Sequence, residues 1–156
     1  MLDELKRLLT RIGDAADTDG LGADELQLAT AALLAHAAAI DGHVAARERA
    51  TLKRLVERHF ALAPDEAEEL VSEAEAAERA AVDIYSFTRV LQSRLSQDER
   101  QRIVELMWEM VAADGEVHPY ESNLVWRAAE LIGVSTRDRV AMRQEVFARH
   151  GIAGSG

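Results

Sequence analysis

The sequence predicts an all-α protein, a single domain folded as a bundle of about seven to eight helices. Its 156 residues are 48% hydrophobic, with abundant alanine and only two prolines, a mixture that favours helix. No run of β-branched residues alternates with polar ones, so no strand is expected. A helix-loop-helix pattern also occurs twice, which predicts an internal duplication within the bundle.

The duplicated pattern reads Asp-Gly-x-Val-x-x-x-Glu. Its first copy runs from Asp41 to Glu48, and its second copy runs from Asp114 to Glu121. In both copies an Ala-rich apolar segment leads into the aspartate and an amphipathic segment follows the glutamate. We therefore expect two matching helix pairs, each joined by an acidic loop, and we expect the function to depend on what these loops do.

The N-terminal part, residues 1–24, is expected to form a short helix followed by a loop. Apolar residues at helical spacing mark one face of that helix, which Gly13 ends. They are Leu2, Leu5, Leu8, Leu9 and Ile12. The main helical domain is expected over residues 25–150, and residues 151–156 are expected to be a flexible tail. Its first helix, residues 25–40, carries few charges and should therefore be central and buried.

Further helix boundaries are indicated by capping residues. A helix over residues 46–60 is followed by one that starts at Ala63-Pro64, since proline suits the first helical turn. Asp83 is expected to cap the next helix, and Ser96 with Glu99 fits a capping box for the one after it. Pro119 should open a helix that ends at Gly133, and Ser135 or Thr136 should cap the last.

Charge and composition exclude several classes of function. The net charge of −10 disfavours binding to nucleic acid, and the lack of cysteine excludes disulfides and thiolate chemistry. The acidic, amphipathic start is unlike a signal peptide, and the longest apolar stretch, residues 26–40, is too short and too polar to span a bilayer. We expect a cytoplasmic protein without direct membrane insertion, whose partner is an unidentified protein.

The two acidic loops have a structural interpretation. Glycine after the aspartate can adopt the left-handed conformation that closes a helix. The valine can pack under the turn, and the glutamate then lies in the first turn of the next helix, where the helix dipole favours its charge. All the shared residues could therefore serve only to end one helix and begin another.

A calcium-binding EF-hand loop is the obvious functional alternative, because its second half has the same Asp-Gly and glutamate spacing. The first half does not fit. The first and third loop positions would be Ala37 and Ala39 in one copy, and Met110 and Ala112 in the other. None of these side chains offers an oxygen, so a standard EF-hand is not expected.

The two loops together allow a different metal site. If the repeats pack about a pseudo-twofold axis, Asp41, Glu48, Asp114 and Glu121 lie close together on one face. Four carboxylates would suit the divalent cations Ca²⁺, Mg²⁺ or Mn²⁺, with water filling the remaining positions. Without a cation, the same arrangement would cost stability through repulsion. The structural and the metal-binding interpretations both stay open.

Other candidate groups carry weaker signals. His36 precedes the first loop and could join carboxylates at a transition-metal site, but its spacing matches no standard ligand pair, so a partly buried structural histidine is the simpler interpretation. Trp108, Tyr120 and Trp126 are expected in the core or in a groove wall, and exposed together they would mark a partner site. No nucleophile, phosphate-binding or acid-base motif is present, so the chain is not expected to be an enzyme.

The motifs resemble those of the tellurite-resistance protein TerB family, and of its relatives at the N-terminus of membrane-anchored DnaJ-like co-chaperones. The resemblance covers roughly residues 26–133. The matching segments are Ala38-Ala39-Ile40-Asp41-Gly42-His43-Val44 with Glu48, and Val111-Ala112-Ala113-Asp114-Gly115-Glu116-Val117 with Glu121. The doubled motif is more specific than either copy alone.

The resemblance implies a compact, internally duplicated bundle of about seven or eight helices. It also implies a bacterial stress-response protein without catalytic activity, whose acidic cluster binds a divalent metal ion through Asp41, Glu48, Asp114 and Glu121. The resemblance also implies an alternative, a scaffold or co-chaperone-like interaction domain in which the loops are purely structural. Its protein partner could then belong to a membrane-associated complex. The first copy departs from the pattern at Ala45-Ala46, where acidic or capping residues are common.

Overall fold

A computed structural model describes residues 19–39, 45–113, 115 and 117–152 of the chain, with side chains from residue 24 onward. Seven α-helices and no strand occur within these ranges, which confirms the predicted all-α class. The helices are α2 (Asp19–Ala38), α3 (Ala46–Phe60), α4 (Pro64–Ala80), α5 (Tyr85–Arg94), α6 (Gln97–Ala112), α7 (Pro119–Ile132) and α8 (Thr136–Arg149). The short helix predicted before Gly13 lies outside the described residues, as does most of the predicted tail.

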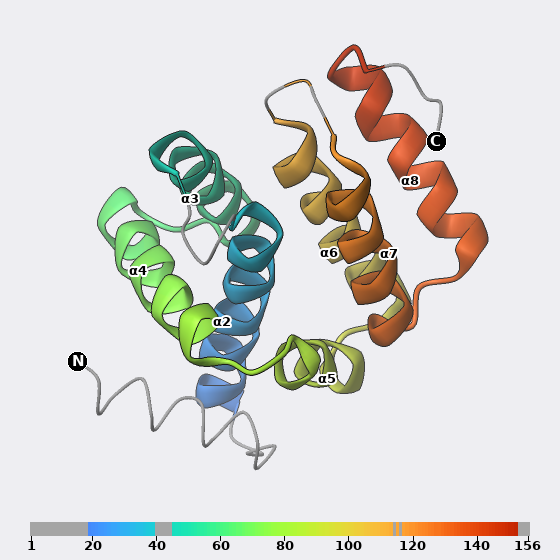
Figure 1. Ribbon diagram of the computed structural model, residues 1–156. Coiled ribbons are helices and arrows are strands. Elements are labelled where there is room, and N and C mark those ends of the chain that lie inside the picture. Colours follow the sequence, from blue (N-terminus) through green and yellow to red (C-terminus); the bar gives the residue numbers. More distant parts are fainter. Residues whose placement is uncertain (1–18, 40–44, 114, 116, 153–156) are drawn as a thin grey trace.

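The helices form two groups of three that α5 connects (Figure 1). In the first group α2 packs on α4 and α3, and in the second group α6 packs on α8 and α7. Across the middle of the bundle α2 contacts α6, while α3 contacts α6 and α7 contacts α2. The packing of α2 on its two partners is therefore repeated by α6, and the duplication extends beyond the predicted helix pairs to α4 and α8.

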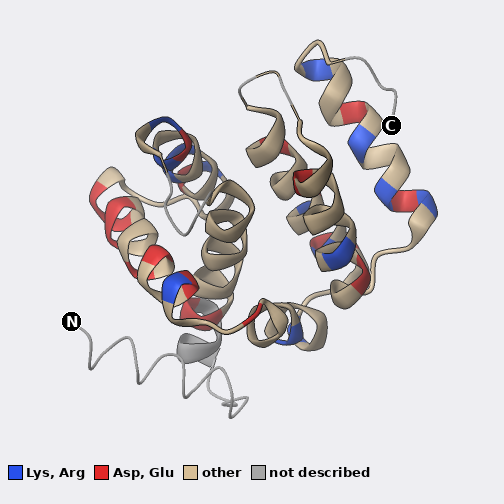
Figure 2. Cartoon of the chain, viewed as in Figure 1, with Lys and Arg blue, Asp and Glu red and all other residues tan. Residues whose placement is uncertain are grey.

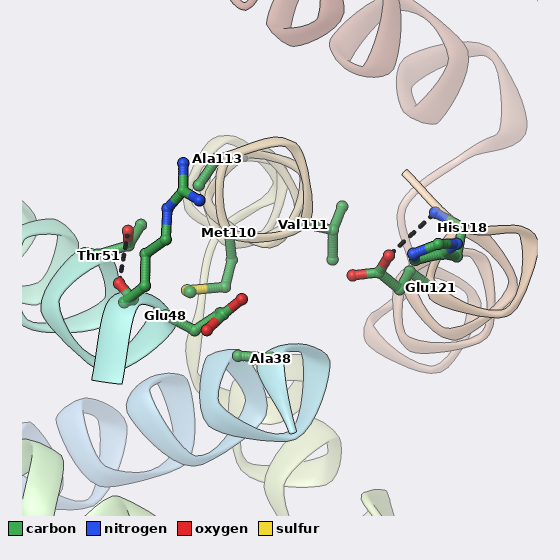
Figure 3. A pocket seen from close by; sticks show the side chains of 9 residues that line it. Ala38, Glu48, Thr51, Met110, Val111, Ala113, His118 and Glu121 are labelled. Carbon is green, nitrogen blue, oxygen red and sulfur yellow. Dashed lines mark hydrogen bonds between the residues drawn. The ribbon is translucent and has the colours of Figure 1, made fainter. Parts of the chain in front are cut away.

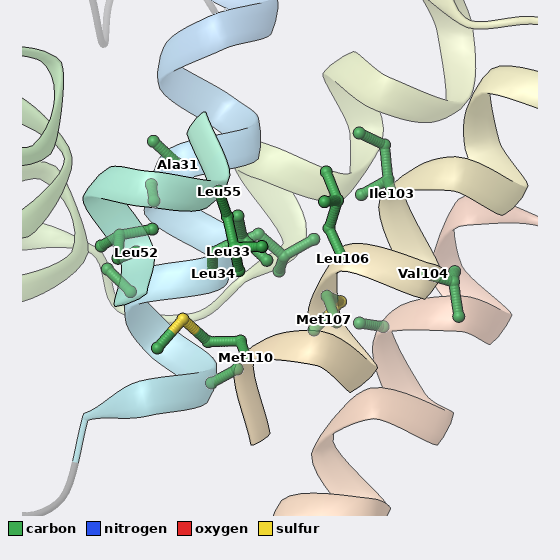
Figure 4. Packing of buried hydrophobic residues seen from close by; sticks show 14 of the residues in the cluster. Ala31, Leu33, Leu34, Leu52, Leu55, Ile103, Val104, Leu106, Met107 and Met110 are labelled. Carbon is green, nitrogen blue, oxygen red and sulfur yellow. The ribbon is translucent and has the colours of Figure 1, made fainter. Parts of the chain in front are cut away.

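The core lies where α2, α3 and α6 meet (Figure 4). Leu33 of α2, Leu52 of α3 and Met107 of α6 are each 0% exposed. From Leu28 to Ala38 every residue of α2 except His36 is buried, and the many alanines let the neighbouring helices approach its backbone closely. The prediction of a central helix is thus confirmed, because a helix that is apolar around its circumference must be covered on all sides.

The central helix has different ends from those predicted. It begins at Asp19, where the sequence indicated a loop up to residue 24, and it ends at Ala38, where residue 40 was expected. Gly20, Gly22 and Asp24 are poor helix formers, but tertiary packing overrides such local preferences. Glu25, the first residue of the predicted helix, therefore lies within α2 and is completely buried.

Most of the predicted caps are present. Ser96 accepts a hydrogen bond from the Glu99 backbone N–H at 3.3 Å, and the Glu99 carboxylate accepts one from the Ser96 N–H at 2.9 Å. Ser135 rather than Thr136 caps α8, and Gly133 ends α7 with a left-handed φ of 92°. Asp83 accepts from the Tyr85 N–H at 2.9 Å, although Ile84 is the residue that directly precedes α5.

Opposite charges line the facing sides of α3 and α4 (Figure 2). The Arg49 guanidinium lies 2.8 Å from a Glu68 oxygen and 2.7 Å from a Glu75 oxygen, and the Lys53 ammonium lies 3.6 Å from Glu68. The hydrogen bond to Glu75 raises the pKa of Arg49 in spite of its partial burial. The hydrogen bond from Arg49 lowers the pKa of Glu68, so both charges persist near neutral pH.

His59, near the end of α3, is expected to make stability depend on pH. Burial lowers its pKa below the ordinary 6.5, the Arg102 charge adds to this effect, and Glu99 opposes it. As the pH falls through about 6.5, the unfolded chain takes up a proton that the folded chain resists, so the free energy of unfolding decreases. Urea unfolding at several values between about pH 7 and about pH 5 should show a shallower decrease for His59→Gln than for the parent. Equal slopes would contradict this prediction.

The carboxylates of Glu68 and Glu99 act at lower pH, so they do not obscure the histidine effect. The pKa of each lies below the ordinary 4.5, because of Arg49 and Ser96 respectively. Their stabilisation is present above about pH 4.5 and is lost only as the pH falls below that value. Between about pH 5 and about pH 7, the change in the free energy of unfolding that His59 causes is therefore not mixed with the effects of Glu68 and Glu99.

Candidate functional site

A small pocket lies between the two halves of the bundle, with a cavity of about 60 Å³. The glutamates of both sequence repeats line it. In Figure 3 the Glu48 and Glu121 carboxylates lie on opposite sides of the view, with Val111 of α6 between them and Met110 beside Glu48. The remaining lining residues are Ala38, Arg47, Thr51, Ala113 and His118.

Each glutamate reaches the pocket from the first turn of a helix. Glu48 is the third residue of α3, which begins at Ala46, and Glu121 is the third residue of α7, which begins at Pro119. Because both glutamates line one pocket, together with Ala38 of α2 and Met110 of α6, these two helix starts face the same region of the bundle. Equal spacing after each Asp-Gly pair thus places the two carboxylates at corresponding positions.

The two carboxylates nevertheless have different hydrogen bonds. One oxygen of Glu121 accepts a hydrogen bond from the His118 backbone N–H at 2.9 Å, which caps α7. Glu48 has the same position in α3, where no side-chain cap is made, and its Oε2 is buried without a hydrogen-bond partner in the described structure. A buried, unpaired carboxylate oxygen is costly unless something compensates its charge.

The surroundings supply little of that compensation. Ala38, Met110 and Val111 present apolar walls, and the Thr51 hydroxyl donates to the backbone oxygen of Arg47 at 3.2 Å instead of to a carboxylate. Arg47 lines the pocket but is an exposed residue, so water screens its charge. The site therefore combines two carboxylates with an environment of few hydrogen-bond donors.

Two of the four predicted metal ligands are described and are brought to one pocket, namely Glu48 and Glu121. Asp41 and Asp114 lie outside the described residues. Within the described ranges, no group of three or more histidine, aspartate and glutamate side chains is arranged to hold a metal ion. Glu48 and Glu121 would thus need further oxygen ligands from the loops or from water.

The second loop also shows features of a structural turn. Gly115 has a left-handed φ of 84°, and its N–H donates to the Ala112 carbonyl at 3.0 Å, as expected at the end of a helix. Val117 is partly buried and packs against the core. Glu121 caps the following helix, so each described residue of the motif in this loop has a structural role.

Two histidines form hydrogen bonds with glutamates at places that follow the duplication. His36 of α2 lies 2.8 Å from a Glu78 oxygen of α4. At the corresponding place in the second half, Glu109 of α6 lies 2.7 Å from His150, which directly follows α8, so histidine and glutamate have exchanged helices. Each pair joins the first helix of its half to the third, in agreement with a structural role for His36.

The three aromatic residues around the second loop differ in how far they are buried. Trp108 is 0% exposed, Trp126 is partly buried against the core, and Tyr120 is 52% exposed. The Arg139 guanidinium also covers the Trp126 ring, 5.4 Å from its centroid. They therefore do not form the shared exposed patch that would have favoured a partner site there.

Sequence reasoning did not reveal that Glu48 lacks a capping hydrogen bond, or that Met110 and Val111 of α6 line the same pocket as the two glutamates. Both glutamates follow Asp-Gly-x-Val at the same spacing, so no signal in the motif distinguishes them. The contribution of Met110 and Val111 follows from the α3–α6 contact, which the sequence does not specify.

Comparison with known proteins agrees with these features. A family model described as "Tellurite resistance protein TerB" matches residues 27–144, more than half of the chain. Searches of curated proteins and of solved structures returned no match. In the described part of the chain, no helix is both long enough and apolar enough to cross a membrane. The resemblance found in the doubled motif is confirmed, and the chain belongs to the TerB family.

Proposed function

We propose that this TerB-family chain is a non-enzymatic stress-response protein that binds a divalent cation between its two repeats. Glu48 and Glu121 act as ligands, and Asp41 and Asp114 add oxygens from the loops. The observation that carries the proposal is the buried, unpaired Oε2 of Glu48 in a pocket that Glu121 also lines. A cation would compensate both charges, and carboxylates are the ligands that Ca²⁺, Mg²⁺ and Mn²⁺ prefer.

A second candidate function is an interaction domain in which the loops are only helix turns. The capping bond of Glu121 and the left-handed Gly115 favour it, because both residues have structural roles without a metal ion. The binding partner of the domain would then be an unidentified protein, for example a member of a membrane-associated complex. The same unpaired oxygen of Glu48 argues against this candidate, since a purely structural turn does not require it.

Thermal unfolding of metal-stripped protein distinguishes the two functions. We expect added Ca²⁺, Mg²⁺ or Mn²⁺ to raise the melting temperature of the parent, with Zn²⁺ as a comparison. A ligand at about 100 times its dissociation constant stabilises by about 2.7 kcal/mol, or roughly 5–10 °C for a domain of this size. The Asp41→Asn/Asp114→Asn variant should lose this shift, and absence of any shift in the parent would make the loops helix turns.

The variant Glu48→Gln should change stability in opposite directions with and without metal. In metal-stripped protein it removes an uncompensated buried charge, so its melting temperature should equal or exceed that of the parent. With the cation present, it should lose the stabilisation that the parent gains. Unfolding curves of the two proteins in both conditions provide the test, and a lower melting temperature without metal would contradict it.

A second ligand variant and a matched control complete the test of the glutamates. Glu121→Gln keeps an oxygen that can cap α7 while it removes a ligand charge, so it should weaken the metal response without the loss of the cap. Glu99→Gln makes the same change at the third residue of α6, where the glutamate is exposed and accepts the capping hydrogen bond from the Ser96 N–H. It should leave the metal response unchanged.

A further inference from the structure

Arg143 is a cation on the buried face of α8. It is only 9% exposed, and its Nε is buried without a hydrogen-bond partner in the described structure. Its two terminal nitrogens also make no hydrogen bond or ion pair with a described residue, but they are not buried, so they can be reached from solvent. A guanidinium keeps its charge in proteins, and a buried charge without a partner is unfavourable. The unused donors of Arg143 therefore favour a negative group beside it.

A second guanidinium lies one helical turn away. Arg139 is four residues before Arg143, so the two side chains are neighbours on the surface of α8. The Arg139 Nε donates to the Val134 carbonyl at 2.9 Å, and its Nη1 donates to the Trp126 carbonyl at 3.4 Å. These bonds hold Arg139 in place but use only two of its five N–H groups. Both arginines thus have donors for one shared ligand.

An aromatic cluster supports both guanidiniums. The Arg139 Cζ lies 5.4 Å from the centroid of the Trp126 ring, and the Arg143 Cζ lies 5.7 Å from that of Phe147. Both rings meet Trp108 edge to face, so the two arginines cover parts of one cluster. A cation over a ring uses the face of the guanidinium and leaves the N–H groups in its plane for other partners. The cluster therefore orients the two cations without satisfying their donors.

We propose that Arg139 and Arg143 together bind a small molecule that carries a phosphate group. Two adjacent positive charges match the double negative charge of phosphate better than the single charge of a carboxylate, and the guanidinium fork pairs with phosphate oxygens in a bidentate manner. The net charge of −10 repels extended polyanions, so a small phosphate compound suits the site better than nucleic acid. The proposal is independent of the metal pocket, because α8, which is described in full, contributes no residue to that pocket.

The carboxylates on α8 and on the helices beside it do not neutralise the two arginines. Asp138 accepts a hydrogen bond from the Gln101 amide at 2.8 Å, and Glu121 caps α7. Glu145 is exposed two residues beyond Arg143, and therefore lies on another face of α8. None of these carboxylates forms an ion pair with either arginine. The same holds for the other carboxylates of α6 and α7, which are Asp98, Glu99, Glu105, Glu109 and Glu130.

Thermal unfolding of metal-stripped protein tests the site with inorganic phosphate as the probe. At equal pH and ionic strength, a change from chloride to phosphate should raise the melting temperature of the parent by roughly 5–10 °C more than that of Arg143→Met, at about 100 times the dissociation constant. Methionine can pack on the aromatic cluster but has no N–H donors. In chloride, Arg143→Met should unfold at the parent's temperature or above it, since it removes a buried charge. Arg137→Met, at an exposed position on the same helix, is the matched control and should respond to phosphate as the parent does.

Tryptophan fluorescence gives a second readout on the folded protein. The chain has two tryptophans, Trp108 and Trp126, and both belong to the aromatic cluster. Titration with sodium phosphate should change the emission of the parent until it saturates, and Arg143→Met should show no saturable change. Sodium acetate, titrated over the same concentrations, distinguishes a phosphate from a carboxylate ligand and should have no saturable effect on the parent.

Three results would overturn the proposal. In the first, phosphate stabilises the parent no more than Arg143→Met, so that its action is the general effect of this salt on proteins. In the second, acetate saturates the fluorescence change as phosphate does, so that the site takes a carboxylate. The third concerns Asp114 and Glu116 of the second loop, which lie outside the described residues. If phosphate acted only on Asp114→Asn/Glu116→Gln, a loop carboxylate would occupy the site in the parent.

Discussion

Replacing Arg94 with methionine is expected to destabilise the protein by about 3–5 kcal/mol, because it leaves a buried carboxylate without its cation. Glu25 of α2 is 0% exposed, and the Arg94 guanidinium at the end of α5 lies 3.1 Å from its Oε2. This contact satisfies the distance of an ion pair, but neither Glu25 oxygen has a well-aligned hydrogen bond among the described groups. The attraction to Arg94 is therefore the main described compensation for the charge.

Urea unfolding of the parent, Arg94→Met and Glu25→Gln/Arg94→Met measures this effect. The double variant should recover most of the lost free energy of unfolding, since it removes both charges together. Arg54→Met, a change at an exposed position in α3, is the control and should stay within about 0.5 kcal/mol of the parent. If the double variant were as unstable as Arg94→Met, lost packing rather than the buried charge would be the cause.

Trp108→Ala is expected to cost a similar amount, about 3–5 kcal/mol, through the loss of packing in the second half of the bundle. Trp108 is 0% exposed on α6. Its ring meets Trp126 of α7 edge to face at 6.1 Å between centroids, and Phe147 of α8 in the same manner at 5.6 Å. One side chain thus connects three helices, and alanine would leave a cavity between them.

Urea unfolding followed by circular dichroism measures the cost. Trp108→Phe should lose much less stability than Trp108→Ala, because it keeps an aromatic ring and removes an indole N–H that has no hydrogen-bond partner in the described structure. Tyr120→Ala removes an exposed aromatic side chain and should have little effect. A small loss for Trp108→Ala would mean that the neighbouring helices close the cavity.

The sequence predicts the helices well where local chemistry sets their ends. Ser96 with Glu99 and Gly133 act at short range through hydrogen bonds to the backbone or a left-handed φ, so their roles follow from the residues alone. The start of α2 was predicted incorrectly because the sequence argument weighed the local helix preference of Gly20 and Gly22, whereas the helix is long and packs as a whole against α4, α5 and α6.

At the candidate site, the residues and their spacing were already evident in the doubled motif. It placed Glu48 and Glu121 at the third residue of helices of matching type, and it supported membership of the TerB family. The packing of the helices showed in addition that both glutamates line one pocket, that Glu121 caps its helix, and that an oxygen of Glu48 has no partner in the described structure. Spacing along a chain fixes local geometry, whereas burial and pairing depend on how separate helices pack against each other.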